Sequence, residues 1–457
     1  MGKRIGTLVI FGASGDLASR LLLPGLGQLV EAGRGGDLRL IGVGRDAVSK
    51  AAWRRRVAKS FAAGGSTGVR SSELAAKAEY LRADVADPED LRRILESCTG
   101  TPAIYFALPP QVTIAACAAL AKVELPRGTV FGLEKPFGTD LRSAEALNRQ
   151  LITLIPERNI HRVDHFLGTS TVLNLLGLRF ANRLLEPVWN ADNVESVEIV
   201  FDEQLGLEGR AGYYDRAGAL IDMIQSHLLL VMALVAMEPP ASVDPEDLRG
   251  AMAQALRATR VFDDDPAGSS RRARYTAGKI GRRSLPSYVK EPGVDPKNRT
   301  ETLTEVTFAI DNWRWAGVPF ILRSGKALAE TRKEIVVTFR KVPHVPSGLG
   351  GDPGPAALRI ALSPDGIELD LNINGQGDPF TLDRVVLSTR FGAGELGPYG
   401  EVLSGLLSDD PTLSVRADAI EECWRIVEPV LTAWKNDAVP LESYRAGTAG
   451  PASWPRK

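Results

Sequence analysis

A short run of small residues near the amino terminus has the composition of a phosphate-binding turn. Residues 12–18 read GASGDLA, directly after an apolar segment and directly before a helical pattern. Small residues at such a turn let the backbone approach a pyrophosphate, and the free N–H groups of the following helix attract its negative charge. The spacing differs from the GxGxxG fingerprint, so a tight strand-to-helix turn without a ligand is the alternative. The cofactor contacts predicted here are Gly12, Ser14, Gly15, Asp16 and Leu17.

Arg45 indicates which dinucleotide this turn would accept. It follows the second apolar segment, at the point where a dinucleotide-binding fold places the residue that meets the adenosine ribose. An acidic residue there favours NAD, whereas the fixed positive charge of an arginine suits the 2′-phosphate of NADP. The sequence therefore predicts NADP as the cofactor, with NAD in second place. The alternative is that Arg45 is a solvated surface charge.

Two of the four histidines stand close to carboxylates in the sequence. His165 follows Asp164 at the end of a strand-like run, and His227 lies in a helical pattern with Asp222. A neutral imidazole that a carboxylate orients can take the proton of a carbinol hydroxyl near neutral pH while hydride leaves the carbon. A helical histidine that serves only the core or the surface is the alternative. Neither HExxH nor CxxC occurs, so no metal site is expected.

Alternating strand and helix patterns must position these residues in the first third of the chain. The patterns occupy residues 6–11, 17–32, 38–43, 49–61, 103–107 and 129–133, and Ser49 can cap the helix that follows it. This βαβ rhythm predicts a doubly wound parallel sheet with its ligand at the carboxyl ends of the strands. We expect an α/β Rossmann domain over residues 1–167.

The rhythm changes after about residue 163. Two long helical patterns, at 171–185 and 219–237, stand among strand-like runs that follow one another without helical crossovers. These runs lie at residues 196–201, 303–310, 334–339, 358–362 and 367–373. We expect a C-terminal α+β domain over residues 168–457, built on a large, mainly antiparallel sheet, for substrate binding and dimerisation.

Composition limits the partners of the protein. The 457 residues exceed one ordinary domain, and 55 Lys and Arg against 56 Asp and Glu give a net charge of -1. Nucleic acid normally requires a basic surface, so no nucleic-acid partner is expected. The longest apolar run, at 228–237, is much shorter than the roughly 18 residues that span a bilayer, and the three cysteines lie far apart. We expect a cytoplasmic protein with no membrane partner and no signal peptide.

Five motifs in one order resemble the glucose-6-phosphate dehydrogenase family. They are GASGDLA at 12–18, EKPFG at 134–138, RVDHFLG at 162–168, NLLGLRFANR at 174–183 and DNWRWAGVPF at 311–320. Further matches lie at 209–215, 323–326 and 424–429. The resemblance implies hydride transfer from the anomeric carbon of glucose 6-phosphate to NADP, which gives 6-phosphogluconolactone at the start of the pentose phosphate pathway. It also implies a homodimer or a dimer of dimers.

The resemblance assigns roles to single residues. His227 matches the general base of the family, and Asp164 matches the carboxylate that orients it. Residues expected to contact the sugar or its phosphate are Lys135, His165, Thr169, Glu203, Asp222 and Lys326. Further residues expected to contact the cofactor are Pro109, Lys135 and Pro136. Pro136 also resembles a position where the family uses a cis bond.

The chain departs from the family pattern where the substrate is recognised. The family has Asp-His-Tyr-Leu-Gly-Lys where this chain has Phe166 and Thr169, so one donor and one cation for the phosphate are missing. Leu21 stands in place of a lysine, Thr331 stands near the position of another basic residue, and Ser363 stands where glutamine is common.

Three hypotheses about function follow. Charge-assisted hydrogen bonds are about twice as strong as neutral ones, so lost cations weaken phosphate binding. Either Thr169, Ser170, His165 and an arginine such as Arg332 rebuild a site for glucose 6-phosphate, or the substrate is an unphosphorylated or differently substituted aldose. The third hypothesis is a sugar- or nucleotide-binding protein without catalysis. The retained Asp164 and His227 argue against it, because a pure binder needs no base.

Overall fold

The computed structural model describes residues 5–35, 37–375, 377–392 and 394–454. The chain forms two compact units. Unit 1 comprises Met1–Leu173, Pro239–Ala253 and Ala393–Glu422, and unit 2 comprises Asn174–Glu238, Gln254–Gly392 and Cys423–Lys457. The chain therefore leaves unit 1 after residue 173 and returns to it twice.

Unit 1 is built on a sheet with the strand order β18-β6-β5-β4-β1-β2-β3. Its strands are β1 (Ile5–Phe11), β2 (Arg39–Gly44), β3 (Glu79–Arg82), β4 (Thr101–Phe106), β5 (Val130–Leu133), β6 (Ile160–Val163) and β18 (Ser414–Val415). Strands β1 to β6 pair in parallel, and β18 pairs antiparallel to β6. This order contains that of a dinucleotide-binding Rossmann fold, so the predicted doubly wound sheet is confirmed.

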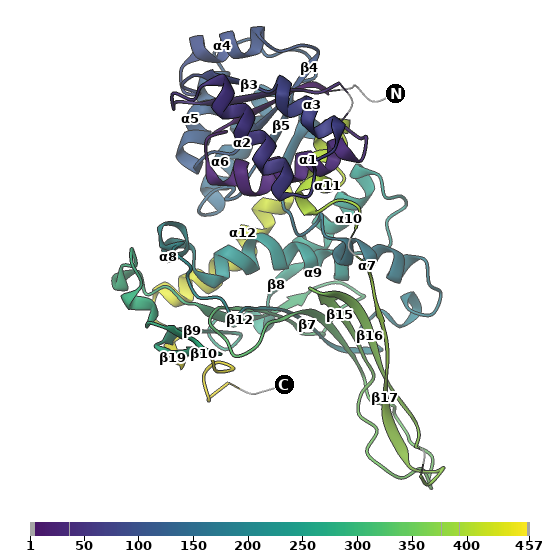
Figure 1. The fold of residues 1–457 in the computed structure, drawn as a ribbon. Coiled ribbons are helices and arrows are strands. Elements are labelled where there is room, and N and C mark those ends of the chain that lie inside the picture. Colours follow the sequence, from purple (N-terminus) through teal and green to yellow (C-terminus); the bar gives the residue numbers. More distant parts are fainter. Residues whose placement is uncertain (1–4, 36, 376, 393, 455–457) are drawn as a thin grey trace. The chain divides into compact units, whose positions relative to one another are not determined.

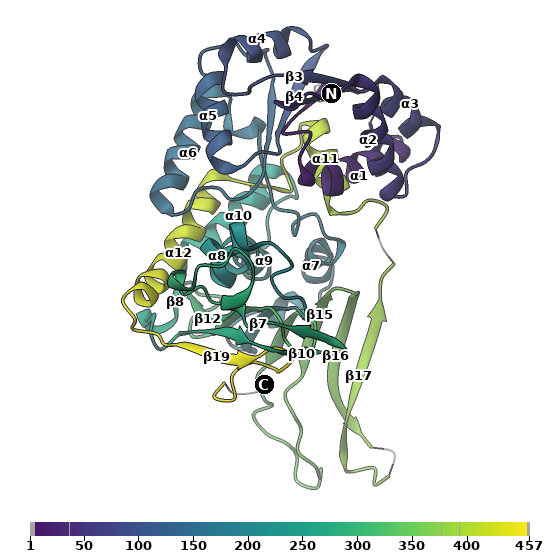
Figure 2. The same cartoon turned by 60° about the vertical axis from the view of Figure 1, so that its left-hand side comes forward.

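Helices cover both faces of this sheet. They are η1 (Ala18–Leu22), α1 (Leu23–Glu31), α2 (Lys50–Ala63), α3 (Val69–Lys77), α4 (Pro88–Glu96), α5 (Pro110–Leu120), α6 (Leu141–Leu154) and α11 (Pro398–Ser408). Figure 2 shows α1, α2 and α3 on one side of the strands and α4, α5 and α6 on the other. The predicted cap of α2 is confirmed, because Ser49 Oγ accepts a hydrogen bond from the N–H of Ala52 at 3.2 Å. Trp53 and Phe61 of α2 are buried in the apolar core.

Unit 2 is built on a larger mixed sheet with the strand order β17-β16-β15-β14-β7-β13-β12-β9-β19, and β8 also pairs with β12. Its strands are β7 (Val194–Asp202), β8 (Thr259–Val261), β9 (Ser270–Thr276), β12 (Leu303–Ile310), β13 (Phe320–Gly325), β14 (Arg332–Phe339), β15 (Ala357–Leu362), β16 (Asp365–Asn374), β17 (Leu382–Arg390) and β19 (Leu441–Arg445). The described pairs are antiparallel except for β13 with β7 and β19 with β9. The predicted mainly antiparallel sheet is therefore confirmed.

Six further α- and π-helices follow β6 in the described part of the chain. They are α7 (Ser170–Phe180), α8 (Ala211–Ala219), η4 (Leu220–Leu228), α9 (Leu229–Ala236), α10 (Pro245–Arg257) and α12 (Ala417–Lys435). Figure 1 shows α8 and α9 over one face of the large sheet. The helix predicted at 171–185 is too long, because the Asn182 side chain donates to the carbonyls of Gly177 and Leu178, both at 3.1 Å, and so ends α7.

The helical run Ala211–Ala236 is long and apolar enough to cross a membrane by length and composition alone. Its most apolar window is 83% buried inside the protein, as in the core helix of a globular domain. The run is also broken, because Gly218 has φ 63° and ψ -178° and so separates α8 from η4. The sequence pattern predicts one continuous helix over 219–237, whereas the structure has a π-helix, η4, followed by α9.

Candidate active site

The glycine turn of unit 1 is held tightly against two strand ends. Gly12 has φ 77°, and a Cβ at this position would lie 2.2 Å from the carbonyl oxygen of Ala107. The N–H groups of Gly12 and Ala13 donate to the carbonyl oxygen of Val43 at 2.9 and 3.0 Å. Only glycine fits this conformation and this contact, so the turn can lie close against the end of β4.

The end of β2 lies beside this turn. A Cβ on Gly44 would lie 3.4 Å from Ser14 Oγ, and Arg45 follows Gly44 with an exposed side chain. Arg82 donates to the carbonyl oxygen of Arg45 at 3.1 Å, which fixes the backbone and leaves the Arg45 guanidinium at the surface. Arg56, which the sequence gave no reason to single out, donates to the carbonyl oxygen of Ser14 at 2.9 Å.

The remaining cofactor candidates flank this turn. Leu17 precedes η1, and Asp16 forms an exposed ion pair with Arg20 at 3.0 Å. The N–H of Gly15 donates to the carbonyl oxygen of Gly12 at 2.9 Å. Pro109 precedes α5, close after the Ala107 carbonyl that touches the turn. A bare backbone turn, a following helix and an exposed cation fit a dinucleotide with a 2′-phosphate.

The next two strands of unit 1 end at the predicted substrate residues. Lys135 and Pro136 follow β5, and the peptide bond between them is cis, as the resemblance implies. Asp164 follows β6, is buried, and accepts a hydrogen bond from the N–H of Phe166 at 2.8 Å through Oδ1. The backbone of its own turn thus fixes the Asp164 carboxylate.

Sequence analysis missed a buried cluster around Glu134. The hydroxyls of Tyr105 and Tyr399 both donate to its carboxylate. Burial raises the pKa of Glu134 to about 7, although both phenols and Lys135 oppose the shift. The Tyr399 ring also stacks on His165, with centroids 6.0 Å apart. The only signal in the sequence was the position of Glu134 in the EKPFG motif.

Glu203 and Lys326 of unit 2 follow two neighbouring parallel strands, β7 and β13. Asp202 pairs with Gly325 at the strand ends, and the N–H of Glu203 donates to the carbonyl oxygen of Gly325 at 2.8 Å. Lys326 Nζ therefore reaches Glu203 Oε2, at 2.9 Å. Burial alone would raise the pKa of Glu203, but the ammonium groups of Lys326 and Lys333 lower it, so the carboxylate stays ionised.

Asp222 and His227 lie on η4, and both are buried. A π-helix is hydrogen-bonded between residues five apart, and Asp222 and His227 are five apart. Their side chains are therefore on adjacent turns of the same side of η4, which an α-helix would not achieve. No pattern in the sequence predicts a π-helix here, although π-helical turns are frequent at functional sites.

A second buried carboxylate that sequence analysis missed fixes the start of η4. Glu301 Oε1 accepts a hydrogen bond from the N–H of Leu220 at 2.9 Å, where a helix dipole favours negative charge. A Cβ on Gly218 would lie 2.2 Å from this oxygen, so only glycine leaves room for it. Burial raises the pKa of Glu301 to about 7 in spite of the backbone donors. Glu301 thus caps the helix that carries Asp222 and His227.

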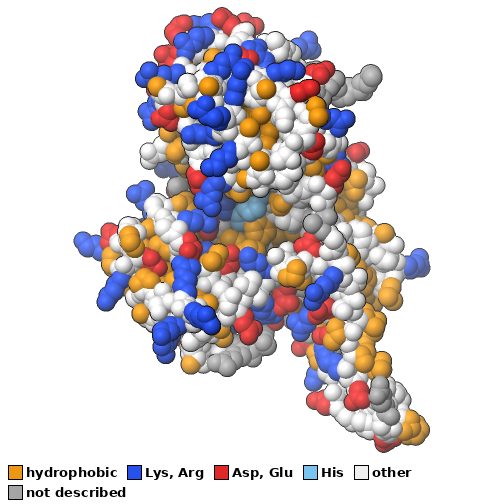
Figure 3. Space-filling model, in the orientation of Figure 1, with side chains coloured by type: hydrophobic (Ala, Val, Ile, Leu, Met, Phe, Trp, Pro, Cys, Tyr) orange, Lys and Arg blue, Asp and Glu red, His pale blue; other side chains and the backbone are white. Residues whose placement is uncertain are grey.

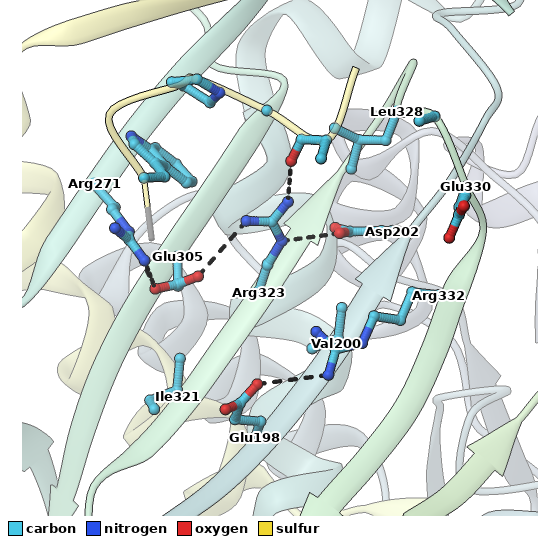
Figure 4. A pocket seen from close by; sticks show the side chains of 15 residues that line it. Glu198, Val200, Asp202, Arg271, Glu305, Ile321, Arg323, Leu328, Glu330 and Arg332 are labelled. Atoms are coloured by element: carbon cyan, nitrogen blue, oxygen red, sulfur yellow. Dashed lines mark hydrogen bonds and ion pairs between the residues drawn. The ribbon is translucent and has the colours of Figure 1, made fainter. Parts of the chain in front are cut away.

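Arg332, the arginine named for a rebuilt phosphate site, is already paired with carboxylates of the large sheet. It lines a cavity on the sheet together with Glu198, Asp202 and Arg323. Figure 4 shows the Arg332 side chain directed toward Glu198, and the two form an ion pair at 3.6 Å. Glu334 also binds the Arg332 guanidinium. Its positive charge is therefore already matched by carboxylates.

Two family models match nearly the whole chain. "Glucose-6-phosphate dehydrogenase, NAD binding domain" matches residues 9–174, and "Glucose-6-phosphate dehydrogenase, C-terminal domain" matches residues 176–456. The chain belongs to the glucose-6-phosphate dehydrogenase family. The family resemblance inferred from the motifs is thereby confirmed.

Members of the glucose-6-phosphate dehydrogenase family match along their full lengths. Glucose-6-phosphate 1-dehydrogenase of Treponema pallidum is 38% identical over 489 residues, covering 99% of this chain and 94% of that protein. The enzyme of Mycolicibacterium smegmatis is 36% identical, covering 97% and 94%. A glucose-6-phosphate dehydrogenase solved with its substrate glucose 6-phosphate has a TM-score of 0.88, 30% identity and coverage of 99% and 97%. The Mycobacterium avium structure has a TM-score of 0.86, 35% identity and coverage of 98% and 95%.

In this member of the glucose-6-phosphate dehydrogenase family, three residues of unit 1 differ from the family pattern at the predicted substrate contacts. Two of them, Phe166 and Thr169, contact neighbouring residues of their own turn. The Phe166 ring is buried and packs edge-on against His165, with centroids 5.0 Å apart. Thr169 Oγ1 donates to the carbonyl oxygen of Phe166 at 2.7 Å. Leu21 is an exposed residue of η1. None of these three side chains carries a charge, so they add no cation to a phosphate site.

Proposed function

We propose that this protein is an NADP-dependent glucose-6-phosphate dehydrogenase. It oxidises the anomeric carbon of glucose 6-phosphate to 6-phosphogluconolactone, the first step of the pentose phosphate pathway. The observation that carries the proposal is η4, which buries Asp222 and His227 on one side of a capped π-helix in a chain of this family. A buried imidazole on a fixed helix suits a general base.

In the proposed mechanism, His227 is the general base. A neutral imidazole takes the proton of the anomeric hydroxyl, and Asp164 is the proposed partner that orients the ring and stabilises its positive charge. NADP, when bound, supplies the hydride acceptor. The residues proposed to hold it are Gly12, Ser14, Gly15, Asp16, Leu17, Arg45, Pro109, Lys135 and Pro136. The close backbone turn at Gly12 and the exposed Arg45 support that assignment.

Substrate contacts are proposed in both units. In unit 2, Glu203, Asp222 and Lys326 hold the sugar hydroxyls, and the ionised Glu203 supports this because a carboxylate accepts from hydroxyl groups. In unit 1, Lys135 contacts the sugar, and His165 and Thr169 contact the phosphate.

A rate measurement tests the proposed activity. Purified protein with NADP and glucose 6-phosphate should form NADPH, measured by its absorbance, with a higher kcat/KM than for a panel of unphosphorylated aldoses. Turnover restricted to a free aldose would support the hypothesis of a different sugar. Binding of sugar or nucleotide without any turnover would support the non-catalytic hypothesis.

A second copy of the chain is the proposed partner. Strand β17 is the edge of the large sheet, and an edge strand presents N–H and C=O groups that can pair with another chain. Val386 and Leu387 on this strand are 52% and 59% exposed. Figure 3 shows hydrophobic side chains along the part of unit 2 that carries β17. Light scattering should give the mass of a homodimer or a dimer of dimers, and Leu387→Asp should lower it.

The proposed location is the cytoplasm. Cys98, Cys117 and Cys423 form no disulfide bond within the part of the chain that the structure describes, and Cys117 and Cys423 are buried. Free thiols are typical of a reducing compartment. Detection of the native protein in a soluble cytosolic fraction would support this location, and recovery from a secreted fraction would contradict it.

A further inference from the structure

Glu203 holds a second ammonium group that the sequence gave no reason to notice. Lys333 Nζ donates to Glu203 Oε1 at 3.2 Å, while Lys326 Nζ donates to the other carboxylate oxygen at 2.9 Å. The Lys333 and Lys326 side chains are 20% and 13% exposed, so both ammonium groups are largely shielded from water. One carboxylate therefore lies between two cations.

Strand geometry explains why Lys333 and not Arg332 reaches this carboxylate. Successive side chains of a strand point to opposite faces, and the two residues are neighbours on β14. Arg332 points to the face where Glu198 and Glu334 bind it. Lys333 points to the other face, where its ammonium lies 4.1 Å from the centre of the Phe201 ring.

The charge of this trio exceeds what a neutral sugar requires. Glu203 and Lys326 alone form a neutral pair that can accept from and donate to hydroxyl groups. Lys333 makes the trio positive by one charge. Each ammonium has three N–H donors, and its bond to Glu203 uses one of them. A partly buried surplus cation attracts an anion more strongly than a solvated one does.

We infer that Lys333 determines specificity for a phosphorylated sugar by binding the phosphate of the substrate. The inference rests on the proposed function and adds one cation of unit 2 to its proposed substrate contacts. In this scheme, the bond to Glu203 holds the Lys333 ammonium in place, and the remaining N–H groups of that ammonium donate to the phosphate. Lys333 is a binding residue in this scheme and takes no part in proton transfer.

The experiment compares Lys333→Gln with the matched control Arg332→Gln. The two positions are adjacent on β14 and face opposite ways, and both substitutions remove one positive charge. For each protein, kcat/KM is measured with glucose 6-phosphate and with glucose, at low and high salt. Lys333→Gln should lower the ratio of the two values by roughly tenfold or more, which is the effect of one charge-assisted hydrogen bond. Arg332→Gln should leave the ratio within about twofold of the native value, as expected of a substitution outside the site.

A conservative variant separates charge from structure. Lys333→Arg keeps a cation and should retain most of the native ratio, while the KM for NADP and the melting temperature stay close to native in all three variants. The native ratio should fall as salt is raised, because a partly exposed pair is screened.

The outcomes distinguish this inference from the proposed function. Native protein that oxidises glucose as well as glucose 6-phosphate would overturn both. A native preference for glucose 6-phosphate that survives Lys333→Gln would overturn only the role of Lys333. An equal loss with both sugars would also overturn it, because Lys333 would then act only by fixing Glu203.

Discussion

Unit 1 and unit 2 position their candidate site residues in different ways. In unit 1 these residues follow the carboxyl ends of parallel strands, as Gly12 follows β1, Arg45 follows β2 and Asp164 follows β6. In unit 2 the parallel pair β7 and β13 does the same for Glu203 and Lys326. Asp222 and His227 instead belong to a buried helix. A parallel sheet places a ligand by topology, whereas a helix must be placed by its own caps.

The same contrast holds for the two glutamates with raised pKa values, the half-buried Glu134 and the buried Glu301. Glu134 of unit 1 is stabilised by the hydroxyls of Tyr105 and Tyr399, which are side-chain donors. Glu301 of unit 2 is stabilised by backbone N–H groups at the start of η4. Removing the Glu134 charge should therefore change only the contacts with the two tyrosines. Removing the Glu301 charge should weaken the cap at the start of η4.

The largest effect is expected at the base. His227→Asn should keep the fold and lower kcat by roughly 10²–10⁴-fold, because a lost general base costs about that much. The KM for NADP should change little. Asp164→Asn should lower kcat less, since the imidazole remains but is poorly oriented. Steady-state kinetics with glucose 6-phosphate checks both, and near-native turnover of the first variant would remove His227 from the mechanism.

The next largest effect is expected at the cofactor side of unit 1. Arg45→Ala should raise the KM for NADP by about tenfold or more and that for NAD much less, because only NADP has a 2′-phosphate for the guanidinium to bind. In contrast to the base variant, kcat at saturating NADP should stay near native. An equal rise of the KM for NADP and the KM for NAD would show that Arg45 is only a surface charge. The strand ends of unit 1 would then not position a cofactor contact at residue 45.

Sequence reasoning worked best where topology alone determines position. The glycine turn, the second strand and the Ser49 cap follow from local patterns, so the Rossmann half could be predicted. The predicted strand at 303–310 coincides with β12. The predicted domain boundary at residue 167 stays a prediction. Local patterns could not indicate that segments 239–253 and 393–422 return to unit 1 from far along the sequence.

Contacts between distant residues could not be predicted. Tyr399 reaches Glu134 and His165 from a segment more than two hundred residues away, and no local pattern indicates that approach. The start of η4 is set by the Gly218 break and by the contact with Glu301, which comes from a different part of unit 2. Lys333 faces Glu203 only because of where β14 pairs with β7. Sequence analysis named its neighbour Arg332 instead.

An effect on stability, not on catalysis, is expected for the two glutamates with raised pKa values. A carboxyl whose pKa rises from about 4.5 unfolded to about 7 folded stabilises the protein below pH 4.5, and that stability is lost as the pH rises through 7. Glu301→Gln and Glu134→Gln should each reduce the fall in the free energy of unfolding between acid and alkaline pH, by up to about 3 kcal/mol. Urea unfolding at acid and at alkaline pH measures it.

The two glutamate variants also sharpen the comparison of the units. Glu301→Gln should lower kcat together with the pH slope, because the cap of η4 is weakened. Glu134→Gln should alter the pH slope without that change in the helix. Unchanged slopes in both variants would mean that neither carboxyl titrates in the folded protein near neutral pH.

The smallest effect is expected from returning a cation to unit 1. Thr169 is half-buried, its hydroxyl is bonded to the Phe166 carbonyl, and the family has a lysine at this position. Thr169→Lys should raise kcat/KM for glucose 6-phosphate a few-fold and leave that for glucose unchanged, because a new ammonium adds a charge-assisted bond only to the dianion. The gain should shrink as salt is raised, since the pair is partly exposed.

The size of that gain depends on which unit supplies the phosphate contact. If the Thr169→Lys gain is large in the Lys333→Gln background and small in the native one, the two cations serve the same phosphate, and the charge lost from unit 1 is replaced by unit 2. Equal gains in both backgrounds would mean that the two positions act on different groups, because independent contacts contribute additively. A native enzyme that already prefers glucose 6-phosphate by several orders of magnitude, and gains nothing from the lysine, would show that the phosphate site is complete without position 169.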